Sequence, residues 1–360
     1  MQRGARPLAP GRLRNRNIGG EDLRPLTLFL TVFVLNYNGR DRPSMNILPP
    51  TTIRPRRLCP GDLLGVVAPA SPAADLARVE AGVRYFEKNG YRVRVGKHAG
   101  SVYGYLAGTD EERVADLHAM AADPEVRAIL CLRGGYGTTR LLPLLEYELF
   151  RRDPKVLVGF SDITALQLAL WHRCRLVTFH GPMVSVDFSG NIDPAAEQSF
   201  WDAVGGAGGD IVLGEPGTLS VLGRGRTEGT LLGGNLSLMA ALAGTPYMPD
   251  FSGAIVMMEE IGEEPYRIDR MLTQLAAAGV FQGVRGIAAG QFSDCLPKDP
   301  SRPSLSVEDL LGALSRTLAV PFNTGCRFGH VSSKVTIPIG LQAGFDATRG
   351  RLTLVCPAVE

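Results

Sequence analysis

The sequence predicts an α/β protein of two domains, the first built on a parallel sheet and the second smaller and richer in strand. Three observations support this prediction. The chain has 360 residues, more than one ordinary domain of about 150. From residue 62 onward, short apolar runs alternate with longer amphipathic ones, as in a parallel sheet with helices on both faces. The regularity fails over residues 187–228, which are rich in glycine, proline and turn residues.

The first domain is expected to alternate strand and helix. Apolar runs of strand length and amphipathic runs of helix length follow one another without interruption. Strands are expected in 62–71, 91–100, 126–137 and 155–160, and helices in 74–90, 111–123, 138–153 and 162–173.

The second domain is expected to carry more strand. Strands are predicted in 254–262, in 285–292 and within 331–356, with one helix in 266–279. The expected division of the chain is a leader in 1–53, a first domain in 54–190, a linker or variable loop in 191–227, and a second domain in 228–360.

Composition indicates an ordinary soluble globular protein. Apolar residues make up 45% of the chain and charged residues 21%, with a net charge of +2, so no nucleic-acid partner is implied. The six cysteines are far apart and form no C-x-x-C pair, which favours reduced, buried thiols over disulfides or a zinc site. We expect neither a metal nor a cofactor.

The N-terminal segment differs from the rest of the sequence. Residues 1–20 are rich in arginine, and the apolar run 25–35 falls short of the roughly 20 residues that a membrane span needs. That run is not followed by an A-x-A-like cleavage site, so we expect neither a signal peptide nor a membrane anchor. Sequence typical of a folded domain begins just after Met45, and residues 1–44 are expected to be a leader translated from a misplaced start. Finding those residues in the native protein would refute this hypothesis.

Ser161 stands between an apolar strand and a helix, which allows two interpretations. A serine at this position is a common N-cap of the helix that follows. It could instead be a nucleophile exposed on a tight strand-to-helix turn. The local motif is G-x-S-D-I from Gly159 to Ile163, without the second glycine of the G-x-S-x-G elbow. The local motif alone therefore favours the cap.

A serine nucleophile needs a base and a group that orients the base. The five candidate bases are His98, His118, His172, His180 and His330, and each alone is more often structural. Four acidic residues could orient the base. Glu263 and Glu264 are explained by the start of a helix at Pro265, whereas Glu259 and Glu260 end a buried strand, where α/β folds place their sites.

The segment R-G-G-Y-G, residues 133–137, directly follows a predicted strand. Its glycines allow backbone N–H groups to point at a ligand, as in an oxyanion hole or a phosphate cradle, although a plain turn explains them equally. The chain lacks the full dinucleotide and P-loop patterns, and it has no H-E-x-x-H motif and no EF-hand loop.

Six ordered motifs together resemble a known family. They are RGGYG, VGFSDIT, FHGPM, GTLLGGNLSL, MMEEIGEEPYRIDRML and GHVSSKVTIPIG, in the order seen in the LD-carboxypeptidases, which are muramoyltetrapeptide carboxypeptidases of the serine peptidase class. The family also includes the microcin C immunity proteins. The resemblance covers roughly residues 55–358 and implies a flavodoxin-like or Rossmann-like first domain, with an active site between the two domains.

The resemblance also implies roles for particular residues. Ser161 would be the nucleophile, His330 the general base and Glu259 its orienter. The family more often has Leu-Glu-Asp where this chain has M-M-E-E, so the acidic member stays open between Glu259 and Glu260. The backbone N–H groups of Asp162 and Gly135 would form the oxyanion hole. Arg133 and Lys334 are the two candidates to receive the substrate's carboxylate.

The expected function is that of a cytoplasmic hydrolase in peptidoglycan recycling at the bacterial cell wall. As a serine protease of the carboxypeptidase type, it would act on a small peptide substrate, murein tetrapeptide, and release the terminal D-alanine through an acyl-enzyme. A second hypothesis is an immunity-type amide hydrolase acting on microcin C-like aminoacyl-nucleotides. A third is a non-catalytic two-domain binding protein in which Ser161 only caps a helix. Similarity suggests a homodimer, and no membrane partner is expected.

Overall fold

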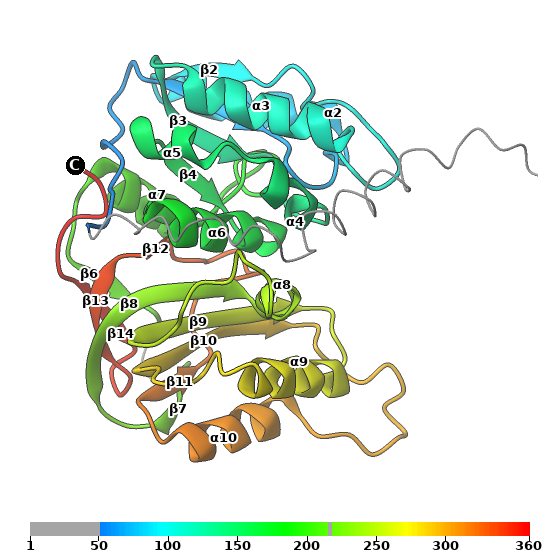
Figure 1. The fold of residues 1–360 in the computed structure, drawn as a ribbon, viewed down its shortest axis with the longest axis vertical. Coiled ribbons are helices and arrows are strands. Elements are labelled where there is room, and N and C mark those ends of the chain that lie inside the picture. The colour runs from blue at the N-terminus through cyan, green and yellow to red at the C-terminus, as the bar shows by residue number, and fades with distance from the viewer. Residues whose placement is uncertain (1–50, 215–217) are drawn as a thin grey trace, which may run out of the picture. The chain divides into compact units, whose positions relative to one another are not determined.

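The computed structural model describes residues 51–214 and 218–360, which fold around two β-sheets (Figure 1). Residues 1–50, which hold most of the leader expected in 1–53, lie outside the described residues. In the part of the chain that the structure describes, no helix combines the length and the apolar character needed to cross a membrane.

The first sheet has six strands in the order β12-β5-β4-β3-β1-β2. Strands β1 to β5 pair in parallel, as expected from the alternation of apolar and amphipathic runs, and only β12 is antiparallel. The strands are β1 Leu63–Val67, β2 Arg92–Val95, β3 Val126–Cys131, β4 Val156–Gly159, β5 Thr178–His180 and β12 Ile337–Ile339. The main helices beside this sheet are α2 Leu76–Lys88, α3 Asp110–Ala122 and α6 Thr164–Cys174.

The single helix predicted over residues 138–153 is wrong. The structure has the short helix α4 Thr138–Leu141, the 3-10 turn η1 Leu142–Leu144 and the helix α5 Tyr147–Arg152. Pro143 lies in the turn and has no N–H for a helical hydrogen bond, and Leu145 after it is extended with a ψ of 132°. The proline therefore divides a segment whose apolar spacing alone fits one continuous helix.

The second sheet has eight strands in the order β6-β14-β13-β8-β9-β10-β11-β7. Its centre, β8 to β11, is parallel, and antiparallel strands complete both edges, so the prediction of a strand-rich second domain is confirmed. The strands are β6 Asp210–Val212, β7 Ser220–Gly223, β8 Arg226–Asn235, β9 Ala254–Ile261, β10 Gly286–Ser293, β11 Phe322–Thr324, β13 Gln342–Asp346 and β14 Arg351–Leu354. The helices are α8 Leu236–Leu242, α9 Pro265–Ala277 and α10 Val307–Leu318.

The segment expected to be a linker, residues 191–227, contains regular structure. Helix α7 Pro194–Gly205 begins at Asp193, whose carboxylate caps the N–H groups of Ala195 and Ala196, and Pro194 takes the first helical position. Strands β6 and β7 follow it and form the two edges of the second sheet. Strand β12, from the C-terminal part of the chain, returns to pair with β5 of the first sheet. The domain limits themselves stay a prediction.

The two sheets come close to each other where helix α6 begins. Thr164, the first residue of α6, accepts a hydrogen bond through Oγ1 from the backbone N–H of Asn235, the last residue of β8, at 3.0 Å. A Cβ on Gly234 would lie 2.4 Å from the same Oγ1, so the backbone of β8 needs a glycine to approach this closely. Helix α8 starts from this point and faces α6 (Figure 1).

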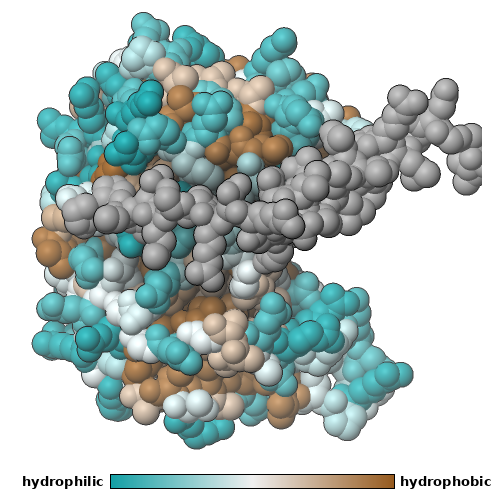
Figure 2. All heavy atoms as spheres, in the orientation of Figure 1, coloured by the Kyte–Doolittle hydropathy of each residue, from teal (hydrophilic) through white to brown (hydrophobic). Residues whose placement is uncertain are grey.

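The visible surface mixes hydrophilic and apolar side chains. In the space-filling view, hydrophilic residues cover most of the face shown, and apolar residues appear as separate patches over both sheets (Figure 2). Such a mixture is ordinary, because apolar atoms contribute much of the accessible surface of folded proteins.

Candidate active site

Ser161 lies on a strained turn between β4 and α6. Strand β4 ends at Gly159, a short 3-10 turn spans Ser161–Ile163, and α6 starts at Thr164. The φ angle of Ser161 is +63°, a left-handed conformation that costs a non-glycine residue about 1–2 kcal/mol. Phe160 and Ile163 occupy the cap positions of the two helical segments, without side-chain capping bonds. Ser161 therefore does not act as the helix cap that the local motif favoured.

Two glycines make this turn sterically possible. A Cβ on Gly159 would lie 2.9 Å from Cγ1 of Ile163, so Ile163 packs directly onto the first glycine of the motif. A Cβ on Gly134 would lie 2.8 Å from Cβ of Ser161 and 3.0 Å from its Oγ. The segment 133–137 therefore contacts the serine, and this contact requires a glycine.

Glu259 and His330 form a close pair in the second domain. Nδ1 of His330 lies 2.7 Å from Oε2 of Glu259. The Glu259 side chain is fully buried in β9, whereas that of His330 is 16% exposed. Ser293 donates a hydrogen bond from its hydroxyl to the backbone oxygen of His330 at 3.1 Å. Gly329 precedes the histidine with a φ of +98°, and a Cβ there would lie 2.6 Å from Oε2 of Glu259.

Glu260 lies on the other face of β9 and has different partners. Its carboxylate accepts hydrogen bonds from the Asn235 side chain at 3.0 Å, from the Ser237 backbone N–H and hydroxyl at 2.8 and 2.6 Å, and from the Ile261 N–H at 2.9 Å. Burial raises the pKa of Glu260, and the bond from Ser237 opposes that shift. Since neighbouring strand residues face opposite ways, only Glu259 reaches the histidine.

Phe160 connects the serine turn to the glutamate–histidine pair. It is buried immediately before Ser161, and its ring centroid lies 5.0 Å from that of His330 at an interplanar angle of 67°. The residue before Ser161 thus contacts the His330–Glu259 pair, although the turn after β4, strand β9 and the loop before β12 supply these residues from distant parts of the sequence.

The segment 133–137 also reaches Asp162 and a serine that the sequence did not indicate. A Cβ on Gly134 would lie 3.2 Å from the backbone nitrogen of Asp162. Gly135 has a φ of +115°, and a Cβ there would lie 2.3 Å from Oγ of Ser71. Ser71 Oγ accepts a hydrogen bond from the backbone N–H of Tyr136 at 3.1 Å. No motif marks Ser71, because its role depends on two segments that meet only in the fold.

The other four histidines have other surroundings. His98 pairs with Asp116 at 3.0 Å, and His118 Nε2 accepts a hydrogen bond from the backbone N–H of Glu146. Burial lowers the pKa of His118 and of His172. His180 alone of these lies near the candidate site, with its ring 5.9 Å from that of Phe160. It is fully buried, which lowers its pKa to about 4, and neither ring nitrogen has a hydrogen-bond partner among the described residues.

The two basic candidates for carboxylate binding differ in their partners. Lys334 is 4% exposed and forms an ion pair with Asp187, with its ammonium 4.6 Å from the Phe160 ring centroid. Arg133 is only partly buried, and its guanidinium donates one long hydrogen bond, 3.5 Å, to the backbone oxygen of Pro72. Within 51–214 and 218–360, Arg133 makes no ion pair. Of the two candidates, only Lys334 therefore has a carboxylate partner in this part of the chain.

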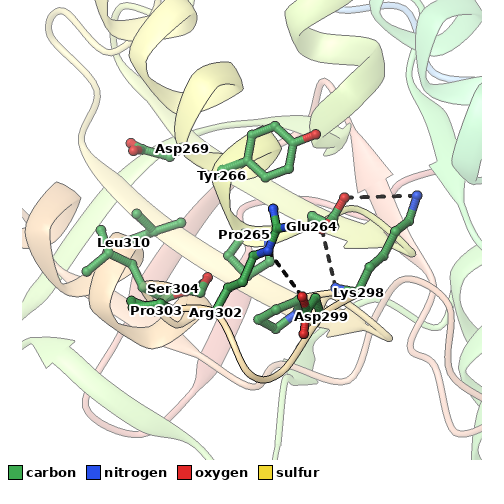
Figure 3. Close-up of a pocket in the computed structure, with 12 residues that line it drawn as sticks. Glu264, Pro265, Tyr266, Asp269, Lys298, Asp299, Arg302, Pro303, Ser304 and Leu310 are labelled. Atoms are coloured by element: carbon green, nitrogen blue, oxygen red, sulfur yellow. Dashed lines mark hydrogen bonds and ion pairs between the residues drawn. The ribbon is translucent and has the colours of Figure 1, made fainter. Parts of the chain in front are cut away.

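A separate pocket of about 570 Å³ lies at the start of α9 and does not include Ser161, Glu259 or His330 (Figure 3). Two ion pairs hold its rim: Glu264 with Lys298 at 3.9 Å, and Asp299 with Arg302 at 3.1 Å. At the start of α9, Glu264 thus has a lysine partner, and Glu263 pairs with Arg267.

The fold and the two family models below define the class of protein, which is a peptidase. The chain belongs to the LD-carboxypeptidase family. The family's N-terminal domain model matches residues 64–181, and its C-terminal domain model matches residues 228–345. The protein is thus a member of a peptidase family, and the two models fall on the two β-sheet regions.

Three relatives illustrate the similarity. A probable murein peptide carboxypeptidase of Bacillus subtilis (strain 168) is 39% identical over 81% of this chain and 91% of its own. The crystal structure of muramoyltetrapeptide carboxypeptidase from Oxalobacter formigenes has a TM-score of 0.71 and 31% identity, covering 81% of this chain and 97% of its own. The microcin C7 self-immunity protein MccF of Escherichia coli is 26% identical over 80% of this chain and 92% of its own.

Proposed function

We propose that this protein is a serine-type LD-carboxypeptidase that releases the terminal D-alanine of murein tetrapeptide in the cytoplasm, as a step in cell-wall recycling. The observation that carries the proposal is the 2.7 Å contact between His330 Nδ1 and Glu259 Oε2, with the His330 ring packed against Phe160, the residue before Ser161. The names of the Bacillus and Oxalobacter relatives support the substrate class. The domain limits 54–190 and 228–360 belong to the same proposal.

In the acylation step, Ser161 Oγ attacks the carbonyl carbon of the amide between the L-centre and the D-alanine. The His330 Nδ1–H donates to Glu259, which leaves Nε2 unprotonated to accept the serine proton. The C–N bond then breaks, and Nε2 gives that proton to the leaving amine of D-alanine. The shortened peptide remains bound to Ser161 as an ester.

Water completes the reaction in the second step. His330 takes a proton from the attacking water, the ester bond breaks, and the proton returns to Ser161 Oγ. The buried carboxylate of Glu259 stabilises the imidazolium that forms in both steps, because it is fully shielded from solvent.

Backbone donors and one arginine complete the proposed site. The N–H groups of Asp162 and Gly135 stabilise the negative charge on the carbonyl oxygen, as an oxyanion hole does. The Arg133 guanidinium binds the free carboxylate of the D-alanine, for which its planar fork of donors is suited. Support for this choice over Lys334 is the ion pair that already joins Lys334 to Asp187.

The second candidate is an immunity-type amide hydrolase, favoured by the 26% identity to MccF. It would use the same three residues on an aminoacyl-nucleotide in place of a peptide. The discriminating experiment incubates the protein with L-Ala-γ-D-Glu-meso-diaminopimelate-D-Ala and, separately, with an aminoacyl sulfamoyl adenosine. Release of D-alanine from the tetrapeptide supports the carboxypeptidase function. Release of the amino acid from the sulfamoyl adenosine, with no D-alanine release from the tetrapeptide, would support the immunity-type hydrolase instead.

A further inference from the structure

The Asp162 carboxylate has no part in the chemistry proposed above, although Asp162 follows the nucleophile directly and is 1% exposed. Its Oδ2 accepts hydrogen bonds from the backbone N–H of Thr138 at 2.8 Å and from the Thr138 hydroxyl. Burial raises the pKa of Asp162, and the Thr138 donors together with the nearby backbone N–H of Gly137 oppose that shift. All three donors lie where the segment 133–137 enters α4. One buried carboxylate therefore ties that segment to the serine turn.

A buried arginine holds the same segment from the opposite side. Arg113 is 2% exposed, and its guanidinium donates to the backbone oxygens of Gly137 at 3.0 Å and of Pro69 at 2.7 Å. Its charge is balanced by an ion pair with Asp110. Arg113 thus holds the C=O of Gly137, and Asp162 holds the N–H of the next residue, Thr138, so the same peptide unit is bound at both ends. Gly137 has a φ of +126°, which suits glycine, and this peptide unit lies only two residues beyond Gly135.

We infer that Asp162 is a positioning residue, whose side chain sets the distance between the two donors of the oxyanion hole. One donor is its own backbone N–H, and the other, on Gly135, belongs to the segment that its carboxylate holds. This inference rests on the proposed function. A donor displaced by about 1 Å can cost on the order of 100-fold in rate, whereas binding of the uncharged ground-state carbonyl changes little.

The test compares Asp162→Ala and Asp162→Asn with Asp116→Ala. Asp116 is a matched control in the same domain, because it is 5% exposed and accepts hydrogen bonds from the His98 backbone N–H and ring. Among the described residues it has no hydrogen bond to Ser161 or to the segment 133–137. Two readouts are used: kcat and KM for D-alanine release, and the rate at which a fluorophosphonate labels Ser161. In the labelling, Ser161 Oγ gives its proton to His330 and bonds to phosphorus, the P–F bond breaks and fluoride leaves, and the phosphoryl oxygen occupies the hole.

We expect Asp162→Ala to lower kcat and the labelling rate about 10- to 100-fold, with KM changed less than about threefold. Asp162→Asn retains an oxygen that can accept from Thr138 and should recover part of the loss. Thr138→Val removes only the hydroxyl bond and should give a smaller loss, so it carries the test if Asp162→Ala does not fold. The inference would be overturned if the Asp162 variants kept the kcat and the labelling rate of wild type. An equal loss of both in Asp116→Ala would also overturn it.

The two readouts separate this inference from the proposed function. If the wild-type protein is labelled at Ser161 but releases no D-alanine, the peptide substrate is wrong, and the labelling rates of the variants still decide the role of Asp162. If the wild-type protein is not labelled at all, the result contradicts both the assignment of Ser161 as nucleophile and the positioning role of Asp162.

Discussion

His330 Nδ1 and Glu259 Oε2 lie 2.7 Å apart, although 71 residues separate them in the chain. The contact depends on Gly329, since a Cβ at that position would lie 2.6 Å from the same carboxylate oxygen. Under the proposed mechanism, this pairing occupies Nδ1 and leaves Nε2 as the nitrogen that accepts the proton of the nucleophile.

Replacing Glu259 should reduce catalysis, whereas replacing the adjacent Glu260 should reduce stability. Glu259→Gln should lower kcat by about 10²- to 10⁴-fold, because the neutral amide no longer stabilises the imidazolium. Glu260→Gln should keep kcat within about fivefold of wild type. It should lower the free energy of unfolding by about 1–3 kcal/mol, because an amide cannot accept all the bonds that Glu260 receives. Steady-state kinetics and urea unfolding measure the two effects, and a reversed pattern would assign the acid to Glu260.

Adding one methyl group at Gly134 should displace the nucleophile. In Gly134→Ala the new Cβ would lie 2.8 Å from Cβ of Ser161, so the turn or the segment 133–137 must shift. We expect a loss of about 100-fold or more in kcat, in line with the cost of a misplaced reacting group. Gly190→Ala is the matched control, since nothing lies within 4 Å of its added Cβ. Equal activity of the two variants would mean that this contact is unimportant.

The buried ring of His180 predicts a pH dependence of stability. Burial is the largest cause of its low pKa of about 4, and His330 and Lys334 add to the shift, while Glu259 opposes it. The unfolded chain, with a pKa near 6.5, binds more protons between pH 4 and 6.5, so stability is full above that window and falls as the pH drops through it. We expect a loss on the order of 2 kcal/mol between pH 7 and pH 5.

Urea unfolding of wild type and His180→Asn over this pH range measures the contribution of that side chain. The variant is expected to be less stable at pH 7 and to lose less stability on acidification than wild type. His98→Asn is the control, since that ring is partly exposed and pairs with Asp116. Parallel pH profiles for wild type and His180→Asn would contradict the prediction.

Arg133 should act on substrate binding and only when the substrate ends in a free carboxylate. Arg133→Ala is expected to raise KM for the tetrapeptide about 10- to 100-fold, because the substrate carboxylate loses its charged hydrogen bonds to the guanidinium. It should leave the KM for the same peptide with a C-terminal carboxamide nearly unchanged. Arg349→Ala, which removes an exposed arginine in a surface ion pair, controls for loss of charge. An equal effect of Arg133→Ala on both peptides would remove Arg133 from the carboxylate site.

The fold could be predicted largely from the sequence because apolar periodicity decides which segments become strands and helices. The exceptions have local causes. Pro143 interrupts a segment of helical spacing, and α7 lies among the glycines and prolines that suggested a linker. The return of β12 to the first sheet depends on long-range pairing between Ile337 and His180, which no local pattern records.

The site was predictable in part. The glycine segment 133–137 and Ser161 follow predicted strands, which made both of them candidates for the site. The local motif around Ser161, however, favoured a helix cap. The positive φ of Ser161 could not be read from its neighbours, because Ile163 takes the place of the usual second glycine and packs on Gly159. The choice of Glu259 over Glu260 required the register of β9, which decides the side of the sheet that each carboxylate faces.

The release of D-alanine from L-Ala-γ-D-Glu-meso-diaminopimelate-D-Ala by wild type and by Ser161→Ala tests the central claim most directly. Ser304→Ala, at an exposed serine away from the turn, controls for the loss of a hydroxyl. The account predicts release by wild type and Ser304→Ala, and a rate lower by at least about 10³-fold for Ser161→Ala. Equal release by wild type and Ser161→Ala, or no release by wild type, would contradict it.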